Sequence, residues 1–120
     1  MSTLLHRIKS NDIKNKNVIV LGDFNAQGIA NTGNKKSIEG ANYIKEIENE
    51  GFREVFKEGE NNPSVTYYDK EIGVRYDHVF FRKGTGDDIS VKIDEYYPES
   101  TDENKWKSDH RGILISLNKR

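Results

Sequence analysis

Residues 18–25 read Val-Ile-Val-Leu-Gly-Asp-Phe-Asn. Four consecutive apolar residues, three of them β-branched, predict a short strand that is buried on both faces. Gly22 would allow a turn or a close backbone approach where this strand ends. Asp23 and Asn25 are two residues apart, which places their side chains on the same side of an extended chain. The stretch therefore predicts a carboxylate and an amide together at a strand end, a common place for a site, although both residues also suit a simple turn.

Composition limits the classes of protein and of site. The 120 residues predict a single domain, and the net charge of -1 gives no overall field toward nucleic acid or anionic lipid. A chain without cysteine has neither disulfides nor thiolate metal sites. No apolar run has transmembrane length, and the first residues lack the apolar core of a signal peptide. We therefore expect a soluble, unexported chain, cytoplasmic by default, whose phosphate binding, if any, is local.

Apolar spacing predicts the remaining elements. A short helix is expected near residues 3–10, and a longer amphipathic helix from an N-cap at Ser37 to a final Gly51. Runs of β-forming residues predict further strands at 64–68, 74–82, 89–97 and 111–117. The expected fold is α/β (α+β), one domain over residues 1–120, with a mixed, largely antiparallel sheet and one long helix on one face. The other face would be bare, which predicts an exposed apolar sheet face or a tight dimer through it.

Further acidic and imidazole groups lie at predicted strand ends. Asp77 is near the start of one strand, and Asp109 and His110 come directly before the last one. If these strands run antiparallel to the first, all of these groups meet Asp23 and Asn25 at one edge of the sheet. Several carboxylates at one edge repel one another unless a cation or a proton lies among them. This set predicts attack on a phosphate ester assisted by Mg²⁺, which prefers oxygen ligands, whereas the lack of cysteine and the few histidines argue against zinc.

Three segments resemble, in order, motifs of the endonuclease/exonuclease/phosphatase superfamily, which has the deoxyribonuclease-I-like fold. They are residues 18–26 (VIVLGDFNA), 75–80 (RYDHVF) and 108–111 (SDHR). His78 is a frequent neighbour in the family and is interpreted here as structural. Family members are about twice this length, and their amino-terminal half supplies a metal-binding Glu that this chain lacks. The resemblance thus implies the carboxyl-terminal half of that domain, one half of a four-layer sandwich.

The resemblance also implies a role for each matching residue. Asp23 would activate the attacking water and help hold the metal, and Asn25 would hydrogen-bond the scissile phosphate. Asp77 would orient His110, and His110 would contact the phosphate or act as acid and base. Asp109 would help ligate Mg²⁺, with Mn²⁺ as an alternative ion.

Three further residues are expected near the substrate. Thr66 lies in a strand where the family often has Thr before an aromatic residue. Trp106 and Arg111 lie with Lys105 and Lys107 around the Ser-Asp-His motif. Basic residues with an aromatic one suit a nucleic acid backbone, although an ordinary polar loop has the same composition.

The expected function is Mg²⁺-dependent phosphodiester or phosphomonoester hydrolysis, nuclease-like, and weak or absent in this half alone. One alternative is a non-catalytic binding or assembly module of the same fold that needs a partner chain. Another is a complete enzyme that works as a homodimer. DNA, RNA, an inositol phosphate and a lipid headgroup all remain open as substrates. The partner of the sheet face would be a second copy or the missing amino-terminal half.

Overall fold

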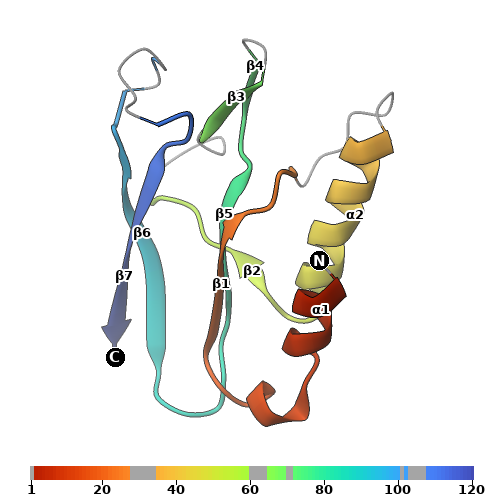
Figure 1. Ribbon diagram of the computed structural model, residues 1–120. Coiled ribbons are helices and arrows are strands. Elements are labelled where there is room, and N and C mark those ends of the chain that lie inside the picture. The colour runs from red at the N-terminus through yellow and green to blue at the C-terminus, as the bar shows by residue number, and fades with distance from the viewer. Residues whose placement is uncertain (1, 28–34, 60–64, 70–71, 101, 103–107) are drawn as a thin grey trace.

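The computed structural model describes residues 2–27, 35–59, 65–69, 72–100, 102 and 108–120. The helical elements are α1 (Ser2–Ile8), the 3₁₀ helix η1 (Asn11–Ile13) and α2 (Lys35–Asn49). The strands are β1 (Val18–Asp23), β2 (Arg53–Glu54), β3 (Tyr67–Asp69), β4 (Ile72–Val74), β5 (Asp77–Arg82), β6 (Ile89–Tyr97) and β7 (Gly112–Lys119). Figure 1 shows the helices on one side of β1 and β5, and the β6–β7 hairpin on the other.

The described strands form antiparallel sheets, in an α+β fold. β1, β5 and β2 make a three-stranded sheet in the order β1-β5-β2, and β3–β4 and β6–β7 make two hairpins. The expected mixed sheet is therefore wrong: the described ladders are all antiparallel, and the parallel contact among them is an isolated bridge between Lys57 and Ile93. A half sandwich of the deoxyribonuclease-I type goes beyond what this arrangement shows.

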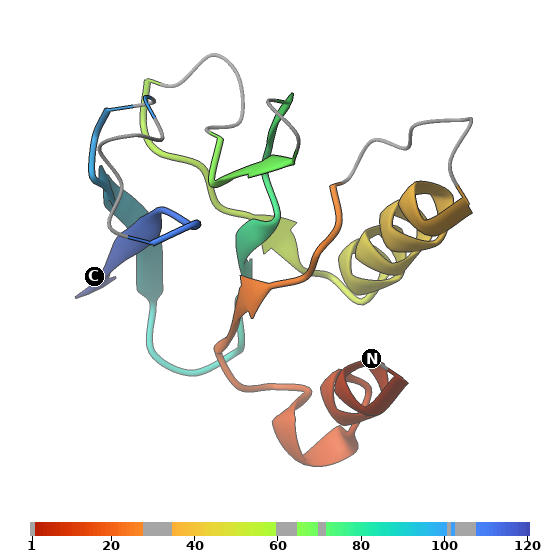
Figure 2. The ribbon, with the colours of Figure 1, turned by 45° about the horizontal axis from the view of Figure 1, so that its top comes forward.

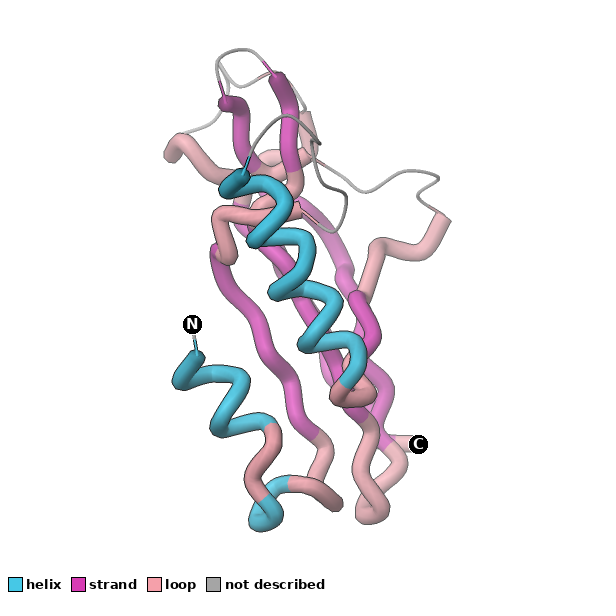
Figure 3. The backbone as a smooth tube through the Cα atoms, turned by 90° about the vertical axis from the view of Figure 1, so that its right-hand side faces the viewer, coloured by secondary structure: helices cyan, strands magenta, loops and turns pink. Residues whose placement is uncertain are grey.

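Two helices cover one face of the three-stranded sheet. Because side chains alternate along a strand, Val18 and Val20 of β1 point to this side and pack against a buried cluster that includes Ile8 of α1 and Ile44 and Ile47 of α2. Figure 3 shows both helices lying in front of the strands. The short helix predicted near residues 3–10 is confirmed as α1, but the sequence predicted only the long helix as the cover of this face.

The opposite face is covered by the β6–β7 hairpin (Figure 2). Val79 of β5 is buried there with Ile93 and Tyr96 of β6, and Ile19 of β1 packs against them. The expectation of a bare face is therefore wrong, because the hairpin supplies the second layer. The expectation that β1 is buried on both faces is also wrong at its end, where Leu21 is 60% exposed.

The observed ends of the helices and strands agree with the predicted ends in some places only. β6 has the predicted limits, and Gly51 ends the α2 region with a φ of 92°, as a glycine after a helix does. Helix α2 begins at Lys35, so Ser37 is not its N-cap. The strand predicted at 74–82 is interrupted, since β4 ends at Val74 and β5 begins at Asp77.

Arg82 ties the helices to the sheet. Its Nη1 donates to the carbonyl oxygens of Ile8 and Glu50, each at 3.1 Å, which lie at the carboxyl ends of the two helices. A cation is favourable at this end of a helix, where carbonyl groups lack intrahelical partners. Its guanidinium also lies over the ring of Phe52, 4.7 Å from the ring centre. Among the described residues, no helix is both long enough and apolar enough to cross a membrane.

Candidate active site

Two carboxylates meet because of the register between β1 and β5. Asp23 is the last residue of β1 and Asp77 the first of β5, and the antiparallel ladder pairs them directly. Alternation along each strand puts both on the same face as Leu21 and Val79, which is the face toward the β6–β7 hairpin. Gly22 precedes Asp23 with a φ of 150°, a backbone conformation that favours glycine.

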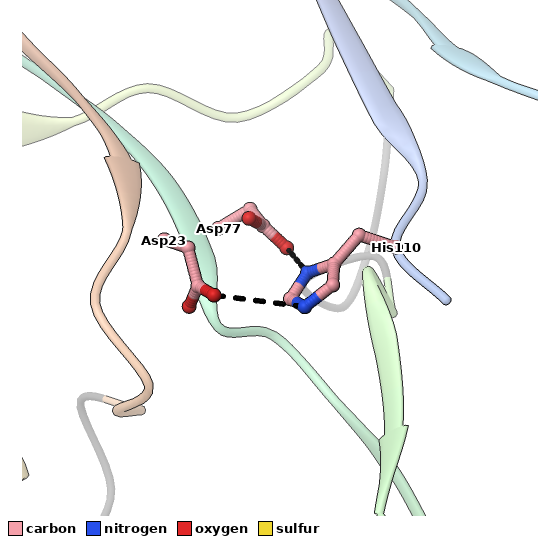
Figure 4. A group of neighbouring side chains, drawn as sticks. All are labelled: Asp23, Asp77 and His110. Carbon is pink, nitrogen blue, oxygen red and sulfur yellow. Dashed lines mark hydrogen bonds and ion pairs between the residues drawn. The ribbon is translucent and has the colours of Figure 1, made fainter. Parts of the chain in front are cut away.

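His110 reaches these carboxylates from the segment before β7. Its backbone bridges to Tyr67 of β3, and its ring stacks on the Tyr67 ring with 4.7 Å between centres. The ring Nδ1 lies 2.7 Å from Asp77 Oδ2, and Nε2 lies 3.6 Å from Asp23 Oδ2. Figure 4 shows the imidazole joined to both carboxylates, one at each ring nitrogen. The positions of these residues at strand ends had predicted that they meet.

The carboxylates favour the charged form of His110. Partial burial acts to lower the pKa of His110, but the hydrogen bond and charge of Asp77, then the charges of Asp23 and Asp109, outweigh it and raise the pKa above 6.5. A ring held by Asp77 through Nδ1 presents Nε2 toward Asp23. The site can therefore offer a positively charged donor beside an acidic oxygen.

Replacing Asp77 by Asn is expected to lower the pKa of His110, because the ring then loses a hydrogen-bonded negative charge. The matched control is Asp109→Asn, which removes a charge that affects the ring less and should lower the pKa by less. Titration of the His110 ring protons by NMR measures both. Since the folded pKa is raised, protonation of His110 stabilises the fold below pH 6.5, and this stabilisation is lost as the pH rises through the folded pKa. An equal or larger shift in Asp109→Asn would contradict this reading of the pair.

A buried hydroxyl supports the position of Asp77. Thr66 Oγ1 accepts hydrogen bonds from the backbone N–H groups of Tyr76 and Asp77, both at 3.1 Å. These contacts hold the chain where it bends between β4 and β5. Thr66 is fully buried, so it lies behind the site, and its burial disagrees with the expected contact with substrate.

Asp23 also takes part in a turn with Asn25, as the residue types at these two positions had suggested. Its Oδ1 accepts a hydrogen bond of 2.8 Å from the backbone N–H of Asn25, which has a φ of 50°. Asn25 is therefore held next to Asp23 and is exposed. The turn interpretation and the site interpretation are compatible, because Oδ1 serves the turn and Oδ2 faces His110.

Other expected site residues lie apart from the central group. Within the part of the chain that the structure describes, Asp23, Asp77 and His110 offer ligand atoms within 4.8 Å of one another, and Asp109 is not in this set. Asp109 is exposed beside His110. Arg111 is 5% exposed and its guanidinium donates to the carbonyls of Val65, Pro98 and Glu99, while the residue lines the same cleft as Asp77. Trp106, Lys105 and Lys107 lie outside the described residues.

A cleft of about 260 Å³ opens beside the central group. Asp77 lines one part of it, and apolar side chains of three strands line much of the rest, namely Leu21, Val79, Ile113 and Ile115. The candidate catalytic atoms are therefore next to a concave surface, as in most small-molecule sites.

Sequence reasoning missed two supports of this site. Tyr67 was assigned only to a strand, although its ring stacks on His110. Glu54 was not singled out, although its Oε2 lies 2.7 Å from His78 Nδ1. A polar residue within an apolar segment after a helix was the available signal for Glu54. Comparisons with protein-family models, with curated proteins and with solved structures found no match to this chain.

Proposed function

We propose that this chain carries the hydrolytic site of a Mg²⁺-dependent phosphoesterase of the endonuclease/exonuclease/phosphatase type. One observation carries the proposal. Asp23, Asp77 and His110 come from separate segments of the chain, and their ligand atoms lie within 4.8 Å of one another. Two like charges so close need a compensating cation or proton, and the His110 ring lies where it can supply one.

The geometry supports a separate role for each of the three. Asp77 holds the imidazole through Nδ1 and favours its charged form. His110 then directs a charged Nε2–H at a phosphoryl oxygen, where it stabilises the negative charge that grows in the transition state. Asp23 is 38% exposed at its side chain and can take a proton from an attacking water or orient it. Asn25, whose backbone N–H is held by the Asp23 carboxylate, is the expected donor to the scissile phosphate.

The donor set fits a hard divalent cation. Mg²⁺ is commonly bound by one or two carboxylates together with waters and the substrate phosphate. Asp23 would hold the ion, and Asp109, which directly precedes His110 in the sequence, is the further carboxylate that the resemblance assigns to it. His110 is a poor ligand for this ion, because both of its ring nitrogens face carboxylates and its pKa is raised. A bound Mg²⁺ would offset charge on the phosphoryl oxygens, and Mn²⁺ would suit the same donors.

A partner chain is the second part of the proposal. The hairpin covers the second sheet face but leaves some apolar side chains of β1 and β7 exposed, namely Leu21 (60%), Leu114 (48%) and Leu117 (57%). Exposed apolar side chains of this kind favour a covering surface. We assign that surface to the amino-terminal half that related domains supply, together with a metal-binding Glu. The chain alone is then expected to be a weak phosphodiesterase, and nucleic acid is the substrate class tested first.

Plasmid nicking in the presence of Mg²⁺ tests the proposal. Asp23→Ala is expected to abolish the nicking of the wild-type chain, because the metal and the attacking water lose their carboxylate. Asp94→Ala is the matched control, since Asp94 is exposed on β6, and it should nick at the wild-type rate.

Each outcome separates the alternatives. Strong nicking by the wild type that Asp23→Ala removes would support a complete enzyme. Weak nicking that rises when an amino-terminal half is added supports the carboxyl half. Absence of nicking in both settings, together with stable self-association through the exposed strands, would leave the non-catalytic assembly module and overturn the hydrolytic proposal.

A further inference from the structure

A second polar cluster is buried behind the candidate active site, with its imidazole on the helix side of the sheet and its guanidinium also donating to Tyr96 Oη, 2.7 Å away, on the hairpin side. Glu54 Oε2 lies 2.8 Å from Arg75 Nε and 2.7 Å from His78 Nδ1. The side chains of Arg75 and His78 are only 4% and 2% exposed. His78 directly follows Asp77 in β5, so alternation along the strand turns it away from the site and toward the helices.

The other ring nitrogen of His78 reaches the segment after β1. Nε2 lies 2.6 Å from the carbonyl oxygen of Ala26. A carbonyl oxygen only accepts, so Nε2 carries the proton and donates it. Glu54 holds the opposite side of the same ring. The imidazole therefore links β2 to the backbone one residue beyond Asn25.

Ala26 is held on its other side by helix α2. Ala26 is 5% exposed, and a Cβ added at Gly40 would lie 2.7 Å from the Ala26 Cβ. Only a residue without a side chain leaves this space. Phe24, on the near side of Asn25, stacks on the His78 ring with 5.5 Å between centres. Both neighbours of Asn25 are therefore anchored on His78.

These anchors matter because the turn between them is unfavourable by itself. Asn25 has a φ of 50°, a left-handed conformation that is uncommon outside glycine, although asparagine tolerates it better than most residues. Its N–H also occupies Asp23 Oδ1 at 2.8 Å. If Ala26 were released, Asn25 would be able to relax to a negative φ, and the Asp23 carboxylate would lose the bond that orients it.

We infer that His78 is a positioning residue, which fixes the turn at residues 23–25 through its bond to Ala26 and so keeps the Asp23 carboxylate aimed at the catalytic group. Glu54 sets the orientation of the ring, as carboxylates behind metal-ligating histidines do. The role of Asp23 in metal binding rests on the proposed function, but the conformation of the turn at residues 23–25 does not. Metal binding and the conformation of the turn are therefore measured separately.

His78→Phe is the main variant. Phenylalanine keeps a ring against Phe24 and removes the donor to Ala26. We expect faster hydrogen exchange at the Asn25 amide, and weaker Mn²⁺ binding by about 10-fold or more, the usual effect of losing such a support. His78→Gln, whose amide Nε2 can donate to Ala26, is expected to restore much of both signals.

Ile47→Ala is the matched control for general destabilisation. Ile47 is fully buried in the apolar cluster between the helices and the sheet. Its side chain has no polar atom, so it makes no hydrogen bond to the turn at residues 23–25. At equal loss of stability, it should leave Asn25 exchange and Mn²⁺ affinity at the wild-type values. Equal losses in Ile47→Ala and His78→Phe would overturn the inference, because the effect would then be general.

Gly40→Ala tests the same turn from the helix side and keeps the inference falsifiable if His78→Phe does not fold. The new methyl group must displace Ala26, whereas alanine is a better helix former than glycine. Faster Asn25 exchange and weaker Mn²⁺ binding are expected, and unchanged values would overturn the inference. A wild-type chain that binds no Mn²⁺ and cleaves no phosphate ester would overturn only the proposed function. Hydrogen exchange at the Asn25 amide would still test the role of His78 in the turn.

Discussion

Replacing Glu54 by alanine is expected to lower the free energy of unfolding by about 3–5 kcal/mol, the usual cost of removing one partner of a buried charged cluster. The Glu54 side chain is 13% exposed, and its Oε2 serves both Arg75 and His78. Loss of this carboxylate leaves the guanidinium and the imidazole buried without their shared acceptor. Small domains have about 5–15 kcal/mol of stability in total, so the variant should be largely unfolded at moderate temperature.

Urea denaturation followed by circular dichroism measures this loss. Glu48→Ala is the matched control, because Glu48 is exposed on α2 and should change stability by no more than about 0.5 kcal/mol. A loss in Glu54→Ala no larger than that of Glu48→Ala would show that the cluster adds no stability.

The same cluster makes stability depend on pH. Burial acts to raise the pKa of Glu54, but the hydrogen bond and charge of His78, then those of Arg75, outweigh it and hold the pKa below 4.5. The stabilisation by Glu54 is therefore complete above pH 4.5 and is lost as the pH falls through the folded pKa. Glu54→Gln should lack this part of the acid dependence, so its stability and that of the wild type should converge in acid.

The second large effect concerns His110. Under the proposed function, His110→Ala is expected to lower the rate of Mg²⁺-dependent phosphodiester cleavage by about 10²- to 10⁴-fold, the usual contribution of a positioned acid–base group. Among the described residues, this ring is the only imidazole in the group with Asp23 and Asp77. A substrate with an activated leaving group, such as a bis(nitrophenyl) phosphate, measures the small rates involved.

His6→Ala is the matched control, since His6 is exposed on α1, and it should cleave at the wild-type rate. A rate in His110→Ala within a few-fold of the wild type would assign the chemistry to the carboxylates alone. Because the pKa of His110 is raised, the wild-type rate should hold to a higher pH than an unperturbed imidazole would allow.

The sequence predicted the elements whose pattern is local. The apolar run at 18–21 and the alternation in β6 gave strands that the structure confirms. The strand-end positions of Asp77 and His110 were also readable, because antiparallel pairing brings such ends together. Asp77 and His110 are 33 residues apart, and both the strand-end positions and the order of the motifs linked them beforehand.

The features that the sequence did not reveal are those that depend on distant contacts. The guanidinium of Arg111 is used by three backbone carbonyls of other segments, and no local pattern shows that burial. Strand β2 has only two residues, too few for any period, so the one signal for Glu54 was its polarity within an apolar segment. The cover of the second sheet face was missed for a similar reason, since nothing in the β6 alternation says which layer its apolar side meets.

The Arg82 contact has a consequence for how the molecule opens. One guanidinium holds the last carbonyl of α1 and the carbonyl just past α2. Because the same Arg82 Nη1 donates to both carbonyls, detaching either helix from the strands also disturbs the hydrogen bond that holds the other helix. The two helical segments should leave the sheet as one cooperative unit, and their slowest-exchanging amides should report the same opening free energy.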